Sequence, residues 1–166
     1  MTAAGPGWAR AASGPPDVRV CTAAASAASR SLGTRVKFTV TNKDPANIRC
    51  ALSAAGVKLV LTAQASSQAY TAYDTAATHF EQAFGAFGHT QHPQNVPGLG
   101  VVASWFPAQQ QLLTTNGTQF RGGSFLTVAI TRWSSPAHSR VSVARAVAER
   151  VLAVAPRGPN PGPPPS

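Results

Sequence analysis

Residues 48–63 read Ile-Arg-Cys-Ala-Leu-Ser-Ala-Ala-Gly-Val-Lys-Leu-Val-Leu-Thr-Ala, two runs in which apolar side chains alternate with other residues. Alternation with a period of two is typical of a strand that buries one face. It places Ile48, Cys50 and Leu52 on one face of the first run, and Val57, Leu59, Leu61 and Ala63 on one face of the second. Because only Ala55-Gly56 separates the runs, the segment predicts an antiparallel hairpin with Cys50 in the core.

The segments around this hairpin predict an α+β fold in which helices pack on an antiparallel sheet. Helical spacing or composition indicates helices over Thr22–Leu32, Ala69–Phe87 and Pro136–Ala155. Alternation indicates strands over Thr34–Thr41, Ile48–Ala54, Val57–Ala65, Val101–Phe106, Gln110–Thr115 and Ser124–Trp133. The expected order is helix–three strands–helix–three strands–helix. The predicted core contains Leu59, Leu61, Phe80, Phe84, Val128, Ile130 and Val147.

The composition of the two ends separates them from the middle of the chain. Residues 1–16 are rich in Ala, Gly and Pro without periodicity, and residues 156–166 form a Pro-rich tail. Segments of this kind bury little apolar surface, so both are expected to be disordered. The remaining segment, 17–155, is long enough for a single α+β domain with its own core.

Cys21 and Cys50 are the only cysteines in the chain, and their spacing fits neither a redox motif nor a zinc motif. A disulfide between them is the main prediction, and it favours export because cytosolic proteins rarely keep disulfides. Two alternatives remain: buried reduced cysteines and lipidation of Cys21. No apolar signal segment precedes Cys21, which disfavours lipidation. The chain also lacks a transmembrane segment, so an exported protein would have a signal that this sequence does not contain.

Several features together resemble the small secreted proteins and lipoproteins of actinobacteria that are grouped as a family of unknown function. A helix opened by Cys21 ends at Leu32-Gly33, and Cys50 lies in a strand followed by the Gly56 turn. An aromatic helix, the Val96–Gly100 loop with Ala103 and Trp105, and a final Ala/Val/Arg helix complete the pattern. The resemblance implies an extracytoplasmic binding or accessory module with no catalytic residues assigned.

Motifs that carry catalysis or hold cofactors are weak. His79, His89 and His92 are the best metal candidates, but they have no suitable carboxylate or thiolate beside them, so no metal site is predicted. Gly98-Leu-Gly-Val-Val-Ala103 fits a dinucleotide fingerprint but lacks the strand before it and the helix after it. No G-x-S-x-G motif or facing carboxylate pair occurs, so we predict no catalytic residues, no cofactor and no enzyme activity.

Two kinds of partner therefore remain. The first is an unidentified protein or small-molecule ligand, for which Trp105, Phe106, Phe120 and Trp133 are the candidate pocket residues. The second is a polyanion, because the net charge is +9 and basic residues gather in the first third of the chain: Arg19, Arg30, Arg35, Lys37, Lys43 and Arg49. No motif that reads nucleic-acid bases accompanies them, so any polyanion binding is expected to be weak, nonspecific and sensitive to salt.

Overall fold

A computed structural model describes residues 14–86 and 92–163, except for the side chains of residues 84–86. Three helices lie within these ranges, α2 (Pro16–Leu32), α3 (Ala69–Ala86) and α4 (Arg140–Val154). The strands are β1 (Lys37–Asn42), β2 (Asn47–Ala54), β3 (Val57–Ser66), β4 (Gln94–Asn95), β5 (Val102–Phe106), β6 (Gln111–Thr115) and β7 (Gly123–Trp133). They form one sheet in the order β1-β2-β3-β7-β6-β5-β4, and every neighbouring pair is antiparallel. The predicted α+β class and antiparallel sheet are confirmed.

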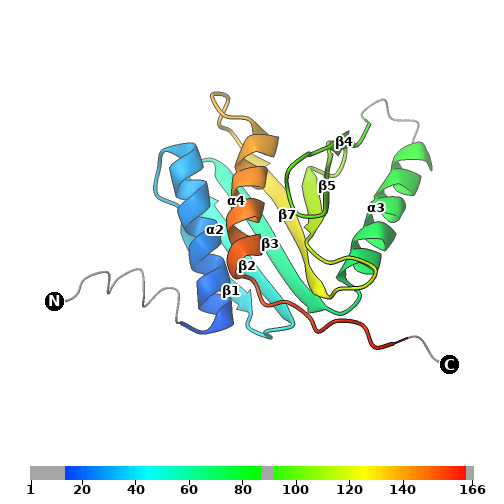
Figure 1. Cartoon of the computed structure of the whole chain (residues 1–166). Helices are drawn as coiled ribbons and strands as arrows, with labels where there is room; N and C mark the ends of the chain where they lie inside the picture. The colour runs from blue at the N-terminus through cyan, green and yellow to red at the C-terminus, as the bar shows by residue number, and fades with distance from the viewer. Residues whose placement is uncertain (1–13, 87–91, 164–166) are drawn as a thin grey trace.

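The helices cover the sheet unequally. Helices α2 and α4 lie side by side across one face, and α3 lies apart from them beside the β5–β7 half (Figure 1). Alternation along each strand sorts the core accordingly. Leu112 and Leu126 belong to the cluster beneath α2 and α4, whereas their neighbours Leu113 and Phe125 pack with Ala69, Tyr73 and Ala77 of α3. The α3 helix therefore occupies the opposite face.

Small residues allow α2 and α4 to pack closely on the sheet. Ala24 and Ala28 of α2 and Ala144 and Ala148 of α4 are all fully buried. The helix α2 ends where predicted, at Gly33, whose φ of 70° lies in the left-handed region and whose N–H donates to Ser29 O. Five predicted core residues are buried: Leu59, Leu61, Val128, Ile130 and Val147. Phe80 is half-buried against the α3 cluster, and the Phe84 side chain lies outside the described residues.

Element boundaries differ from the prediction where capping chemistry outweighs periodicity. The helix α2 begins six residues before Thr22, because Pro16 suits the first turn and Asp17 complements its dipole. The helix α4 begins at Arg140, where the Ser139 side chain accepts a hydrogen bond from the Ser142 N–H. The strand β4 is missing from the prediction, because its two residues give no alternation to detect. The second half of the sheet thus holds four strands rather than three.

The first part of the C-terminal tail is docked on the sheet, in place of the disorder expected from residue 156 onwards. The Gly158 N–H donates to Gly123 O over 2.9 Å, and the Ser124 hydroxyl donates to Pro156 O. The Asn160 side chain accepts from the Gly122 N–H over 3.3 Å. We call residues 156–160 the C-terminal strap. It crosses the ends of β3 and β7 (Figure 1), where backbone hydrogen bonds supply the ordering that apolar side chains do not.

A buried tyrosine links α3 to β5 and gives a first prediction. The Tyr73 hydroxyl lies 2.8 Å from the Ser104 hydroxyl, and burial raises the pKa of Tyr73 above its usual 10.0. The unfolded chain therefore loses this proton first as the pH rises. The contribution of Tyr73 to stability is constant below about pH 10 and falls above it.

We expect the free energy of unfolding of wild type to fall more than that of Tyr73→Phe between about pH 9 and pH 11, as measured by urea unfolding. Tyr70→Phe is the matched control because Tyr70 is the other tyrosine of α3. Equal pH dependence in wild type and Tyr73→Phe would contradict the burial of this hydroxyl.

Candidate functional site

Within the described residues, no helix covers the sheet face opposite α2 and α4 over β1 and β2, and α3 contacts only a small part of β3. We call this face the open sheet face. Strand register arranges its side chains in four rows that run across the strands. Row 1 contains Lys37, Ser53, Lys58 and Arg132; row 2 contains Thr39, Ala51, Val60 and Ala129; row 3 contains Asn42, Arg49, Thr62 and Thr127; row 4 contains Asn47, Gln64 and Phe125. Most of these side chains carry hydroxyl, amide or cationic groups, which is typical of an antiparallel sheet face that meets water or a polar partner.

Two hollows open on this face and share one residue. The polar hollow has a volume of about 290 Å³ and is lined by Thr41, Asn42, Asn47, Arg49, Thr62 and Gln64. The second has a volume of about 580 Å³ and lies against α3, with Gln64, Phe80 and Phe125 in its wall. We call it the α3 hollow. Gln64 borders both hollows, so they adjoin each other between β1 and α3, and we call the pair the depression.

The polar hollow contains an unsatisfied amide. The Asn47 Oδ1 atom is buried and has no hydrogen-bond partner among the described residues. A buried acceptor without a donor costs free energy, and in folded proteins such groups are few. Asn47 lines the polar hollow, so its amide is a group of this site whose hydrogen bonds are incomplete.

The charge of the open sheet face is one-sided. Lys37, Arg49, Lys58 and Arg132 are all exposed on it. The five acidic residues of the chain lie elsewhere, at Asp17, Asp44, Asp74, Glu81 and Glu149, and none belongs to a described strand. Asp44 is the nearest in sequence, and its carboxylate accepts from the Ala46 N–H within the β1–β2 turn. The face therefore presents four cations without a carboxylate between them.

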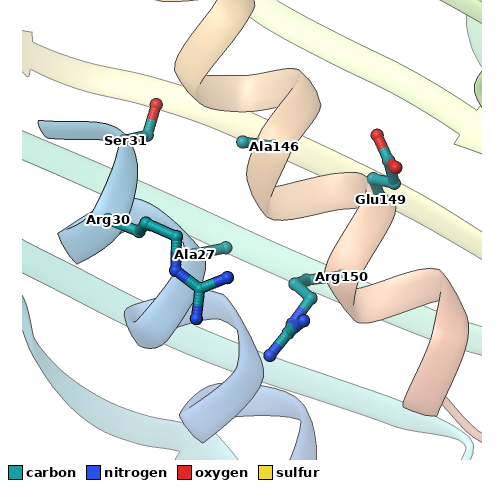
Figure 2. Close-up of a pocket in the computed structure, with 6 residues that line it drawn as sticks. All are labelled: Ala27, Arg30, Ser31, Ala146, Glu149 and Arg150. Atoms are coloured by element: carbon teal, nitrogen blue, oxygen red, sulfur yellow. The ribbon is translucent and has the colours of Figure 1, made fainter.

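A third hollow lies on the other side of the molecule. It has a volume of about 360 Å³ and lies between α2 and α4, with Ala27, Arg30, Ser31, Ala146, Glu149 and Arg150 around it. We call it the helix-side groove. Figure 2 shows the Arg30 and Arg150 side chains extending toward the same end of the groove, while the Glu149 carboxylate points away from them. With a carboxylate on its rim and alanines in its wall, this groove offers fewer hydrogen-bonding groups than the open sheet face.

The four predicted pocket residues do not come together. Trp105 is buried beneath α2 and α4, while its neighbour Phe106 is buried on the α3 side, because successive strand residues point to opposite faces. Trp133 packs against the α2–α4 core at the end of β7. Phe120 is 81% exposed in the β6–β7 connection. Three of the four predicted residues therefore serve the two cores, and the aromatic residues that line a hollow of the open sheet face are Phe80 and Phe125 instead.

The predicted disulfide is present. Cys21 of α2 and Cys50 of β2 are bonded, with their Cα atoms 5.7 Å apart, and both are fully buried. The Cys21 sulfur is therefore not available for a lipid, which excludes that alternative for this residue. No helix within residues 14–86 and 92–163 is long and apolar enough to cross a membrane.

The weaker sequence motifs fall in different places. His79 is exposed on α3 and lines the α3 hollow, His92 is exposed, and His89 lies outside the described residues. In the part of the chain that the structure describes, no group of three His, Cys, Asp or Glu residues could hold a metal ion. Gly98 and Gly100 have positive φ angles in the turn before β5, so they shape that turn.

One serine–histidine pair was missed by the sequence analysis. The Ser135 hydroxyl lies 2.8 Å from His138 Nδ1 in the turn before α4. The two residues are three apart in one turn, and the His138 N–H also donates to Ser135 O over 3.1 Å. These contacts stabilise the turn, and they lack the third group that orients the base in a nucleophilic site.

The signal that would have located the open sheet face was present in the sequence. The hairpin alternation that buries Ile48, Cys50 and Leu52 also aligns Asn47, Arg49 and Ser53 on the other face. What periodicity could not show is that, in the part of the chain that the structure describes, α2 and α4 both lie on the opposite face (Figure 1). No family model, no curated protein and no solved structure matches this chain, so the candidate site stands on its geometry alone.

Proposed function

We propose that this protein is a non-enzymatic, extracytoplasmic binding module that takes a ligand or partner on the open sheet face. The observation that carries the proposal is the depression, in which the polar hollow and the α3 hollow adjoin at Gln64. Binding sites are typically concave, with a few polar groups beside an apolar wall. Here Arg49 and the amides supply the polar groups, and Phe80 and Phe125 supply the apolar wall.

The fold favours a rigid receptor over a catalyst. The floor of the depression includes residues of β2 and β3, which are interior strands of the sheet, and the disulfide anchors β2 to α2. A site built on strands holds its side chains more precisely than a site built on loops. The strands carry no carboxylate that could act as an acid or base, and the Ser135–His138 pair lies in the turn before α4, whereas the lining of both hollows comes from other segments.

Export is supported by the disulfide, since cross-links of this kind persist in oxidising compartments. The resemblance to small actinobacterial secreted proteins and lipoproteins points to the same location. We therefore place the module in the cell envelope or outside the cell.

A second function is a nonspecific association with polyanions driven by charge alone. The observation that favours it is that cations occur on both sides of the molecule: four on the open sheet face, and Arg30 and Arg150 in the helix-side groove. Under this alternative, binding depends on net charge and not on which face carries it.

Filling the depression tests the proposal. In Gln64→Trp, the indole occupies the junction of the two hollows, and a strand position accepts Trp readily. On an array that carries neutral glycans, acidic glycans and extended peptides, we expect wild type to bind at least one class. Gln64→Trp should then weaken that binding by about tenfold or more.

Ser31→Trp is the matched control because it places the same side chain in the helix-side groove. It should bind like wild type, and circular dichroism and thermal unfolding establish that both variants fold. Binding that survives Gln64→Trp, or an absence of binding to every class on the array, would refute the open sheet face as the site.

A further inference from the structure

Three of the four residues in row 1 of the open sheet face are cations. Lys37 lies opposite Ser53 between β1 and β2, Ser53 opposite Lys58 between β2 and β3, and Lys58 opposite Arg132 between β3 and β7. Like charges directly opposite each other on neighbouring strands are destabilising. Here the Lys58–Arg132 pair lies beside a register shift in the β3–β7 ladder, and no strand supplies a carboxylate to offset it. An anion from outside the chain would relieve this repulsion.

A fourth cation, Arg49, lies farther along the same face. Arg49 is opposite Thr62, which is four residues beyond Lys58 on β3, so the two cationic positions are about 13 Å apart along the strand. Row 2 separates them and consists of Thr39, Ala51, Val60 and Ala129, which are small or medium-sized residues. The floor between the charges is therefore low and neutral. It suits a chain that carries negative groups at intervals.

We propose that the open sheet face binds an acidic polysaccharide that lies along β3, with one acidic group at Lys58 and Arg132 and another at Arg49. This inference rests on the proposed function and names its ligand class. The polar hollow at the Arg49 end offers Thr41, Asn42, Asn47, Thr62 and Gln64 to sugar hydroxyls. Among these residues, Asn47 has a side-chain oxygen with no donor in the described structure, so its amide still has a hydrogen bond to form.

A polysaccharide fits this face better than a nucleic acid does. Proteins that hold single-stranded nucleic acid usually stack its bases on exposed aromatic rings. Rows 1, 2 and 3 contain no aromatic residue, and Phe125 of row 4 is buried. Hydroxyl and amide side chains beside small apolar residues instead match a hydroxylated chain whose sugar rings have apolar faces.

The test compares two pairs of substitutions that remove the same charge from opposite sides of the molecule. Lys58→Gln/Arg132→Gln acts on row 1, and Arg30→Gln/Arg150→Gln acts on the helix-side groove. All four side chains are exposed, so neither pair disturbs the core. The probes are polygalacturonate, neutral dextran, single-stranded DNA and anionic lipid vesicles, each titrated with the full chain at low and at physiological salt.

We expect wild type to bind polygalacturonate more tightly than dextran, DNA or vesicles. The row 1 pair should weaken polygalacturonate binding about tenfold, and the groove pair should change it less than about threefold. Arg49→Gln should weaken it as well, with the decrease smaller than for the row 1 pair.

Each other outcome overturns the inference in a recognisable way. If both pairs weaken binding equally, net charge alone is responsible. If dextran binds as tightly as polygalacturonate and Gln64→Trp abolishes this binding, the open sheet face is a binding site but not one for an acidic ligand, so the proposed function survives. If DNA or vesicles bind more tightly and lose affinity in the row 1 pair, the partner belongs to another class.

Discussion

Cys21→Ala/Cys50→Ala is expected to lower the free energy of unfolding by about 3.6 kcal/mol at 25 °C. The two cysteines are 29 residues apart. A cross-link that closes a loop of this length lowers the conformational entropy of the unfolded chain, and this raises the free energy of unfolding by about that amount. The bond also joins α2 to β2, and both sulfur atoms are buried where water and reductant do not reach them. Urea unfolding of wild type and variant measures the difference directly.

Unfolding of wild type in the presence of a reductant separates the cross-link from the packing of the sulfur atoms. Reduced wild type retains both thiols in the core, so its free energy of unfolding should lie between that of the oxidised protein and that of the double variant. A loss below about 1 kcal/mol in the double variant would show that the bond contributes little to the fold.

The hairpin and the disulfide show what local pattern predicts well. Alternation in residues 47–66 fixes which residues share a face, and this correctly turns Cys50 toward the helix that carries Cys21. The same reasoning correctly identifies Leu59, Leu61, Val128 and Ile130 as core residues. These predictions succeed because the period of two is a property of the strand itself and does not depend on the order of strands in the sheet.

The predicted aromatic pocket failed because the face of the sheet that each residue meets depends on tertiary structure. Trp105 and Phe106 are both apolar and adjacent, so the sequence groups them, but the strand sends them to opposite cores. Which helix covers which face follows from the strand order, with β7 between β3 and β6. This order brings residues far apart in the chain into one row, such as Lys58 and Arg132, and no local pattern contains it.

The C-terminal strap was missed for a different reason, since its contacts are made by the backbone. A composition rich in Pro and Gly predicts disorder when side-chain burial is the only source of order considered. In this structure, Gly122 lies against the backbone of Gly158 and Pro159, and Gly158 lies against the backbone of Ser66, so a Cβ atom on either glycine would overlap the backbone beside it. The glycines therefore permit close approach between two backbones, which then exchange hydrogen bonds.

Gly158→Ala is accordingly expected to lower the free energy of unfolding by about 2–3 kcal/mol. The new Cβ atom would overlap the backbone of Ser66, which belongs to β3 and cannot move aside as a flexible side chain would. The strap must then leave the sheet. It would lose the bonds from Gly158 N–H to Gly123 O and from Gly122 N–H to Asn160, and the Ser124 hydroxyl would lose Pro156 O. Each hydrogen bond contributes about 1 kcal/mol net.

Gly162→Ala is the matched control, because a Cβ atom at Gly162 meets nothing within 4 Å. It should change stability by less than about 0.5 kcal/mol. A chain that ends after residue 155 should lose as much stability as Gly158→Ala, because the substitution acts only by displacing the strap. If Gly158→Ala instead matches Gly162→Ala in urea unfolding, the strap does not stabilise the ends of β3 and β7. The Ser66 wall of the α3 hollow would then depend on β3 and α3 alone.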